Sequence, residues 1–135
     1  MAKFTWTYGN VARPWPEIRK FYEELQGKHS APLKSLVFQI ADSPYPAAGL
    51  HGLTSHADLL LGPQPAVMDE SHLRIHYDFD QGNILMVYPS PGIDSTKGAT
   101  WVRRVKVDDA FAVLERFLVK RVRWFRDHRG SRPAK

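Results

Sequence analysis

Residues 72–89, HLRIHYDFDQGNILMVYP, contain the clearest structural pattern in the chain. From position 73 to position 80 apolar and polar side chains alternate, which is the period-2 pattern of a strand with one buried face. Residues 80–83, DQGN, predict a turn, and residues 84–88 predict a second strand. A two-residue loop at Gln81-Gly82 would oppose three apolar pairs on one face: Phe79 with Ile84, Tyr77 with Met86, and Ile75 with Tyr88. We therefore predict that this β-hairpin forms the centre of a sheet.

Three other segments show the alternation that is typical of strands. Residues 3–8 predict a short edge strand, and residues 52–61 predict one continuous strand. One face of residues 52–61 would carry Leu53, Ser55, Ala57, Leu59 and Leu61, and the other would carry Thr54, His56, Asp58 and Leu60. Residues 100–107 predict the last strand, whose inward face would consist of Trp101, Arg103, Val105 and Val107. The chain thus supplies a mainly antiparallel sheet of four to five strands.

Two helices are predicted before residue 43. Pro16 suits a first helical turn, and Gly27 is a natural stop. The apolar stripe between them consists of Ile18, Phe21, Tyr22 and Leu25. Residues 33–41 fit both helical spacing and strand alternation, but Ser30 as a cap and Pro32 in the first turn favour a helix, which we predict.

A long C-terminal helix is predicted from Asp108 or Asp109 to about Arg129. At 100° per residue its apolar side chains fill an arc of about 180°, which requires a sheet to pack against. The sequence therefore predicts one α+β domain over residues 1–129, with an N-terminal helix (or two) and the long C-terminal helix packed on one face of the sheet. Residues 130–135 are predicted to form a flexible basic tail.

The composition excludes several classes of function. The chain has 135 residues, 43% hydrophobic and 24% charged, and no cysteine, which rules out disulfides, thiolate metal sites and cysteine nucleophiles. No apolar run approaches the roughly 20 residues of a membrane span, and the N-terminus lacks the pattern of a signal peptide. A cytoplasmic protein without membrane partners is the expectation.

Basic residues are concentrated at the C-terminal end. Residues 116–135 hold eight Lys and Arg against one acid, whereas residues 1–115 hold eleven against thirteen acids. Cations at a helix end suit its dipole, and the same cluster can also bind a polyanion such as nucleic acid. No helix-turn-helix, zinc-finger, RNP or GXXG pattern accompanies it. The candidate residues of this cluster are Arg116, Lys120, Arg123 and Arg126.

Arg103 and Arg121 occupy positions of predicted apolar faces. A buried guanidinium must be paired, so each arginine either reaches the edge of the core or forms a salt bridge with an acid such as Glu17 or Asp42. The functional alternative is a bidentate contact with an anionic ligand. Both arginines are therefore added to the anion-binding candidates.

The other face of the predicted sheet carries ionisable side chains. His56, Asp58 and His76 can converge across neighbouring strands, and a histidine beside a carboxylate is a usual general-base pair. The alternative is a solvated polar face without chemistry. His72 and His76 would lie roughly 13 Å apart along one strand and so could not share a metal. Neither a metal site nor a cofactor is predicted.

The same face has an aliphatic centre inside a charged rim, which is typical of a protein interface. The residues concerned are Leu60, Leu85, Val87, Arg74 and Asp78. The sequence therefore favours a non-enzymatic protein-interaction module that presents its open sheet face to a partner protein or to a second copy of the chain. Two alternatives stay open: polyanion or nucleic-acid binding by the basic C-terminal helix, and an enzyme that uses the His/Asp cluster.

Overall fold

The computed structural model describes residues 12–25, 31–55, 57–63, 72–89 and 98–125. Within these residues five antiparallel strands follow one another, each paired with the next along the chain. The strands are β1 (His51–Ser55), β2 (Asp58–Gly62), β3 (Leu73–Asp78), β4 (Asn83–Tyr88) and β5 (Trp101–Val105). The predicted α+β class and the predicted antiparallel sheet are confirmed.

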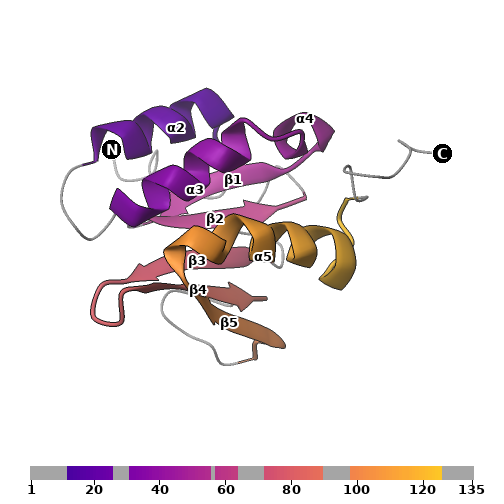
Figure 1. Ribbon diagram of the computed structural model, residues 1–135. Helices are drawn as coiled ribbons and strands as arrows, with labels where there is room; N and C mark the ends of the chain where they lie inside the picture. The colour runs from indigo at the N-terminus through magenta and orange to yellow at the C-terminus, as the bar shows by residue number, and fades with distance from the viewer. Residues whose placement is uncertain (1–11, 26–30, 56, 64–71, 90–97, 126–135) are drawn as a thin grey trace, which may run out of the picture.

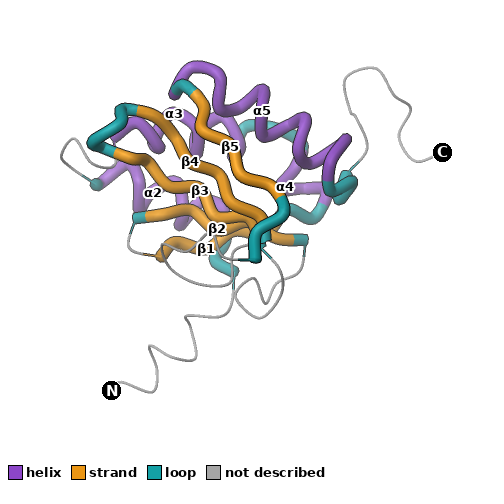
Figure 2. Tube along the Cα trace, turned by 90° about the horizontal axis from the view of Figure 1, so that it is seen from below, coloured by secondary structure: helices purple, strands orange, loops and turns teal. Residues whose placement is uncertain are grey.

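The helices lie together on one side of the sheet (Figures 1 and 2). They are α2 (Trp15–Glu24), α3 (Ala31–Ala41), the short α4 (Tyr45–Ala48) and α5 (Ala110–Arg116). Pro16 stands in the first turn of α2, and α3 buries one apolar stripe, so the strand alternative for residues 33–41 is wrong. The core between helices and sheet includes Ile18, Tyr22, Leu36, Ile40, Leu59, Leu61, Leu73, Ile75, Ile84, Met86, Leu114 and Phe117.

The central hairpin forms as predicted, but its register is displaced by two residues. Tyr77 pairs with Ile84 and Ile75 with Met86, whereas the sequence predicted Tyr77 opposite Met86. A displacement of two residues keeps every side chain on its predicted face, because strand side chains alternate with a period of two. Ile75 and Tyr77 therefore still face the helices.

The displacement arises in the hairpin loop, which spans residues 79–82 rather than two residues. Gly82 has a φ of 70° and donates its backbone N–H to Asp78 O at 2.8 Å, while Gln81 donates its N–H to Asp78 Oδ1 at 3.1 Å. Asp78 thus fixes the turn with both its backbone and its side chain. Phe79 lies in this loop and is 43% exposed, so its predicted inward position is wrong.

Residues 52–61 form parts of two strands, not one. β1 turns into β2 through two residues, and Ala57 has a φ of 72°, a left-handed conformation that is uncommon for a residue other than glycine. The reversal separates side chains that a single strand would have placed together. Leu59 and Leu61 join the core under the helices, whereas Leu53 packs with Leu60 on the opposite face.

The two edges of the sheet differ. At β1, Arg13 donates its backbone N–H to Gly52 O at 2.9 Å and so forms an isolated bridge. Helix α2 approaches the same edge so closely that a Cβ on Gly52 would lie 3.0 Å from side-chain atoms of Trp15 and Ile18. At the other side, β5 is the outermost strand. The strand predicted for residues 3–8 lies outside the described residues.

The predicted long C-terminal helix is wrong. The helical segment has 15 residues and consists of the 3-10 turn η2 (Val107–Asp109), α5 and the π turn η3 (Phe117–Arg121). Arg123 then takes a left-handed φ of 57°. Trp124 packs back onto Phe117, with ring centroids 5.9 Å apart, so the apolar side chains after residue 121 reach the core without a longer helix. Residues 126–135, including the predicted tail, lie outside the described residues.

Candidate functional site

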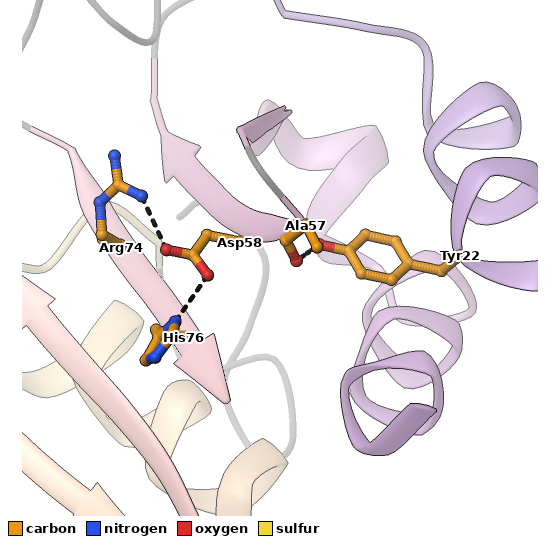
Figure 3. A network of polar contacts seen from close by, with 5 residues as sticks. All are labelled: Tyr22, Ala57, Asp58, Arg74 and His76. Carbon is orange, nitrogen blue, oxygen red and sulfur yellow. Dashed lines mark hydrogen bonds and ion pairs between the residues drawn. The ribbon is translucent and has the colours of Figure 1, made fainter. Parts of the chain in front are cut away.

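Asp58 joins β2 to β3 through two side-chain contacts on the sheet face away from the helices. Arg74 Nη1 lies 2.8 Å from Asp58 Oδ2, and His76 Nδ1 lies 2.8 Å from Asp58 Oδ1 (Figure 3). Asp58 and Arg74 are buried, whereas the His76 side chain is 42% exposed. The structure therefore brings two of the three catalytic candidates together, while His56 lies outside the described residues.

The contact with Asp58 gives the His76 ring a fixed direction. A carboxylate that binds one ring nitrogen orients the imidazole and directs the other nitrogen elsewhere. In Figure 3 the second nitrogen of His76 points away from Asp58. His76 also lines a cavity of about 330 Å³ together with Leu33, Ala57, Asp58, Tyr77, Asp78, Phe79 and Asp80. The pair therefore places an oriented imidazole beside a cavity.

Tyr22 holds the turn next to Asp58 from the helix side. Its hydroxyl donates to Ala57 O at 2.7 Å (Figure 3). Burial, and to a smaller extent the negative charge of Asp58, raises the pKa of Tyr22 far above its ordinary value. The hydroxyl therefore keeps its proton and continues to donate to the turn.

Asp78 forms a second ion pair near the same end of the sheet. Arg104 Nη1 lies 2.9 Å from Asp78 Oδ2 and 2.9 Å from Asn83 Oδ1. The hydrogen bond from Arg104, followed by that from the Gln81 N–H, lowers the pKa of Asp78 below its ordinary value. This residue of the predicted interaction face is thus already paired within the chain.

The centre of the predicted interaction face is buried within the chain itself. Leu60, Arg74 and Val87 are 0%, 3% and 4% exposed, and Leu85 is half-buried. Val102, which pairs with Val87, is 39% exposed. Among the described residues of this face, accessible side chains include His76 of β3 and Val102 of β5, not the predicted aliphatic centre.

A second cavity lies between β5 and the C-terminal helical segment. Its volume is about 280 Å³, and it is lined by Trp101, Arg103, Val113, Arg116, Phe117, Lys120 and Arg121. We call it the cationic groove, because four of these residues are cations and none is an acid. All four cations are exposed, and within the described part of the chain none forms a salt bridge. The structure thus gathers four of the six predicted anion-binding residues around one cavity.

Arg103 points to the helix side of the sheet as predicted, but it is exposed because β5 is the edge strand. Its Cζ lies 5.0 Å from the ring centroid of Trp101, and its Nη1 donates to Val102 O at 2.9 Å. A guanidinium over an indole ring is a favourable arrangement. Of the two structural solutions expected for Arg103, a position at the edge of the core and a salt bridge, the first is observed, since the edge strand leaves the guanidinium in contact with water.

The π turn places Arg121 at the cationic groove instead of in the apolar arc. Hydrogen bonds in a π turn run between residues five apart, so side chains five apart lie near one side, as Arg116 and Arg121 do. Val122 N–H donates to Phe117 O at 2.9 Å in this way. Arg121 is exposed, and its Nη2 donates to Thr100 O at 3.3 Å.

The remaining predictions for the basic residues have different outcomes. Asp42, considered from the sequence as a partner for a buried arginine, binds Arg19 at 2.8 Å instead. Arg123 is exposed but does not line the cationic groove, and Arg126 lies outside the described residues.

Trp101 of the cationic groove was predicted only as part of the inward face of the last strand. Trp101 is two residues from Arg103 on the same strand face, so their contact follows from alternation and was accessible from the sequence. Arg74 was predicted on the interaction face, but no local pattern predicts its burial between its strand partners Leu60 and Val87 or its ion pair with Asp58.

No known protein family, curated protein or solved structure matches this chain. Among the described residues, no helix has both the length and the apolar character needed to cross a membrane. In the same residues no three histidine, aspartate or glutamate side chains are grouped so that they could hold a metal ion. A function must therefore be inferred from the geometry of the two cavities.

Proposed function

We propose that this protein is a non-enzymatic binding module that holds an anionic group in the cationic groove. The observation that carries the proposal is the convergence of Arg103, Arg116, Lys120 and Arg121 on one cavity whose lining contains no acid. Arg103 comes from β5, and the other three come from α5 and η3. The cluster therefore exists only in the folded chain.

Electrostatics favours an anion at this position. Four like charges around one cavity repel each other, and a bound anion removes that repulsion. Arg103 and Arg121 donate hydrogen bonds to the neutral carbonyls of Val102 and Thr100. A carboxylate or phosphate oxygen is a stronger acceptor, because hydrogen bonds between ionised groups are shorter and about twice as strong. Both arginines can therefore exchange a weak partner for a strong one.

The size of the cationic groove suits one anionic group rather than a whole polyanion. Its volume of about 280 Å³ is slightly smaller than the roughly 300–1,000 Å³ of pockets that enclose small molecules. Trp101, Val113 and Phe117 supply apolar walls, which strengthen the field of the cations. The rest of a larger ligand would extend beyond the groove over neighbouring surface.

Titration with pyrophosphate and with heparin tests the proposal. We expect saturable NMR shifts of the Trp101 indole N–H and of the Arg103 and Arg121 side-chain N–H signals. The affinity for heparin should fall steeply between about 50 and about 200 mM salt, because exposed charges are screened and counterions are released. Replacing Arg116 and Lys120 by Gln should weaken binding about thirtyfold, since each charge-assisted contact contributes roughly 1 kcal/mol and about 1.4 kcal/mol corresponds to a factor of ten.

Replacing Lys20 and Lys34 by Gln is the matched control. This variant loses the same charge from α2 and α3, and neither lysine lines the cationic groove. Equal losses of affinity in the two double variants would mean that binding follows net charge and that the groove is not the site. No binding of either probe at low salt would end the proposal.

The contact between His76 and Asp58 supports a second candidate function, proton abstraction in the neighbouring cavity. That cavity is lined by three carboxylates and no lysine or arginine, so a neutral or cationic substrate would fit it. Acylation of His76 by diethyl pyrocarbonate measures the nucleophilicity of the exposed ring nitrogen. A rate well above that of free histidine would support this function, and an equal or slower rate would contradict it.

A further inference from the structure

The outer edge of β5 indicates what kind of anion the cationic groove receives. Among the described residues β5 pairs only with β4, and Val102, Arg103 and Arg104 are exposed. The opposite edge of the sheet, in contrast, carries the bridge from Arg13 to Gly52. We propose, on the basis of the proposed function, that an extended acidic segment of a partner protein pairs with β5 and places a carboxylate in the cationic groove.

The backbone of the edge strand supplies the first part of this recognition. Backbone N–H and C=O groups at the edge of a sheet form a template for an extended peptide. Adjacent strands lie about 4.8 Å apart, so the side chains of an added strand would stand beside those of β5 on both faces of the sheet. Every second side chain would then lie on the helix side, where Trp101 and Arg103 line the cationic groove.

Charge selects an acidic partner. Arg103 and Arg104 are consecutive in a strand and therefore point to opposite faces. The cations of the C-terminal helical segment, Arg116, Lys120 and Arg121, add positive charge on the helix side. On the helix side, Asp or Glu side chains of an added strand would thus meet Arg103 and these cations, and opposite charges on neighbouring strands attract. On the other face Arg104 already binds Asp78.

The same charges disfavour a second copy of this chain as the occupant. Two β5 strands paired edge to edge would bring Arg103 and the other cations of the groove close to those of the second copy, and like charges on paired strands are destabilising. Cationic side chains are a common protection of edge strands against such pairing. An added strand with acidic side chains would instead be attracted by the same cations.

An extended peptide uses more of the observed surface than a nucleic acid would. Phosphate contacts require only the cations and are independent of the edge strand. A peptide that alternates acidic and β-branched residues would use the cations, the backbone edge and the exposed Val102 together. The structure therefore favours a protein strand as the ligand.

Two synthetic peptides and one oligonucleotide test this inference. The first peptide alternates Val and Glu over about eight residues, an ordinary strand length, and the second has the same sequence with N-methylated backbone amides. The third probe is a short single-stranded DNA. We expect the first peptide to bind, to slow hydrogen exchange of the β5 amides, and to bind at least about tenfold more tightly than its N-methylated form. Arg103→Gln should lower its affinity severalfold, and Lys20→Gln should leave it unchanged.

The outcomes separate this inference from the proposed function. Equal affinity of the two peptides, or binding without protection of the β5 amides, would overturn strand addition and leave the cationic groove as a general anion site. DNA binding at the groove without peptide binding would overturn it in the same way. If pyrophosphate, peptide and DNA all fail to bind at low salt, the proposed function itself is wrong.

Discussion

Arg74 and Asp58 form a 2.8 Å ion pair in which the two side chains are only 4% and 9% exposed. Arg19 and Asp42 form an ion pair of the same length on the surface, where the side chains are 38% and 68% exposed. The two pairs have the same residue types and the same contact distance. A comparison of the two pairs therefore shows how burial alone changes the contribution of an ion pair to the free energy of unfolding.

Asp58→Asn should lower the free energy of unfolding by about 3 kcal/mol, because it removes the carboxylate charge that lies 2.8 Å from a buried guanidinium. Asp42→Asn should lower it by at most about 1 kcal/mol, because water already solvates both partners. Urea unfolding followed by circular dichroism measures both values. Similar losses in the two variants would contradict the burial of Arg74 and Asp58.

The local sequence pattern predicted those helices that have a single apolar stripe and those strands that have a single run of alternating apolar and polar residues. The apolar stripe of α3 and the inward faces of Ile75 and Tyr77 are of this kind. The reversal between β1 and β2 was missed because it contains no glycine, and because Ala57 fits the alternation of a strand as well as it fits a turn. A turn made of residues without a strong turn preference cannot be recognised from the sequence pattern.

The cationic groove was predictable only as a set of residue types. A regular helical wheel placed Arg121 among apolar side chains, and the π turn at residues 117–121 moved it to the side of Arg116. The position of Arg103 depended on β5 being an edge strand, which the order of the strands decides. Helix irregularity and strand order are set by packing between distant segments, so the local sequence does not reveal them.

Tyr22 should make the stability of the protein depend on pH in the alkaline range. Its pKa is raised in the folded state, whereas an unfolded chain releases this proton near about pH 10. Below that pH both states hold the proton and the contribution is complete; above it the unfolded state loses the proton first, so the free energy of unfolding falls as pH rises.

Tyr22→Phe tests this dependence. At about pH 8 the variant should be less stable by about 1 kcal/mol, because the hydrogen bond to Ala57 O is lost. From about pH 9 to about pH 11 it should lose less stability than the parent protein, since Phe has no proton to release. Urea unfolding of both proteins at about pH 9 and about pH 11 measures how much the free energy of unfolding falls between these values. An equal fall in the variant and the parent protein would contradict the burial of the Tyr22 hydroxyl.

Asp78 should make the stability of the protein depend on pH in the acidic range, whereas Tyr22 acts in the alkaline range. Its pKa is lowered in the folded state, first by Arg104, so its contribution is present above the ordinary value of about 4 and is lost as pH falls through the lowered value. Asp78→Asn should therefore flatten the decrease in stability below about pH 4. Arg104→Gln should flatten it as well, and acid unfolding curves of the two variants provide the measurement. A slope that depends on Asp78 but not on Arg104 would show that the turn hydrogen bonds, rather than the ion pair, lower this pKa.

Ala57 and Gly82 have nearly the same backbone conformation, with φ of 72° and 70°. A left-handed conformation raises the free energy of a residue with a Cβ by about 1–2 kcal/mol and is neutral for glycine. Gly82→Ala should therefore destabilise the protein by about 1 kcal/mol, since nothing lies within 4 Å of the added Cβ and only the backbone resists it. Ala57→Gly should stabilise it by up to about 1 kcal/mol, because the relief of strain exceeds the entropy that glycine adds to the unfolded chain.

Urea unfolding of these two variants decides between the two descriptions of residues 52–61. In a continuous strand, glycine at position 57 would destabilise the protein, because glycine weakens a strand interior. In the hairpin of β1 and β2 the same substitution removes strain and leaves the hydrogen bond from Tyr22 to the backbone carbonyl of residue 57 in place. A stabilising Ala57→Gly therefore places the reversal at this residue, and with it the start of β2 at Asp58, from which the contacts with Arg74 and His76 follow.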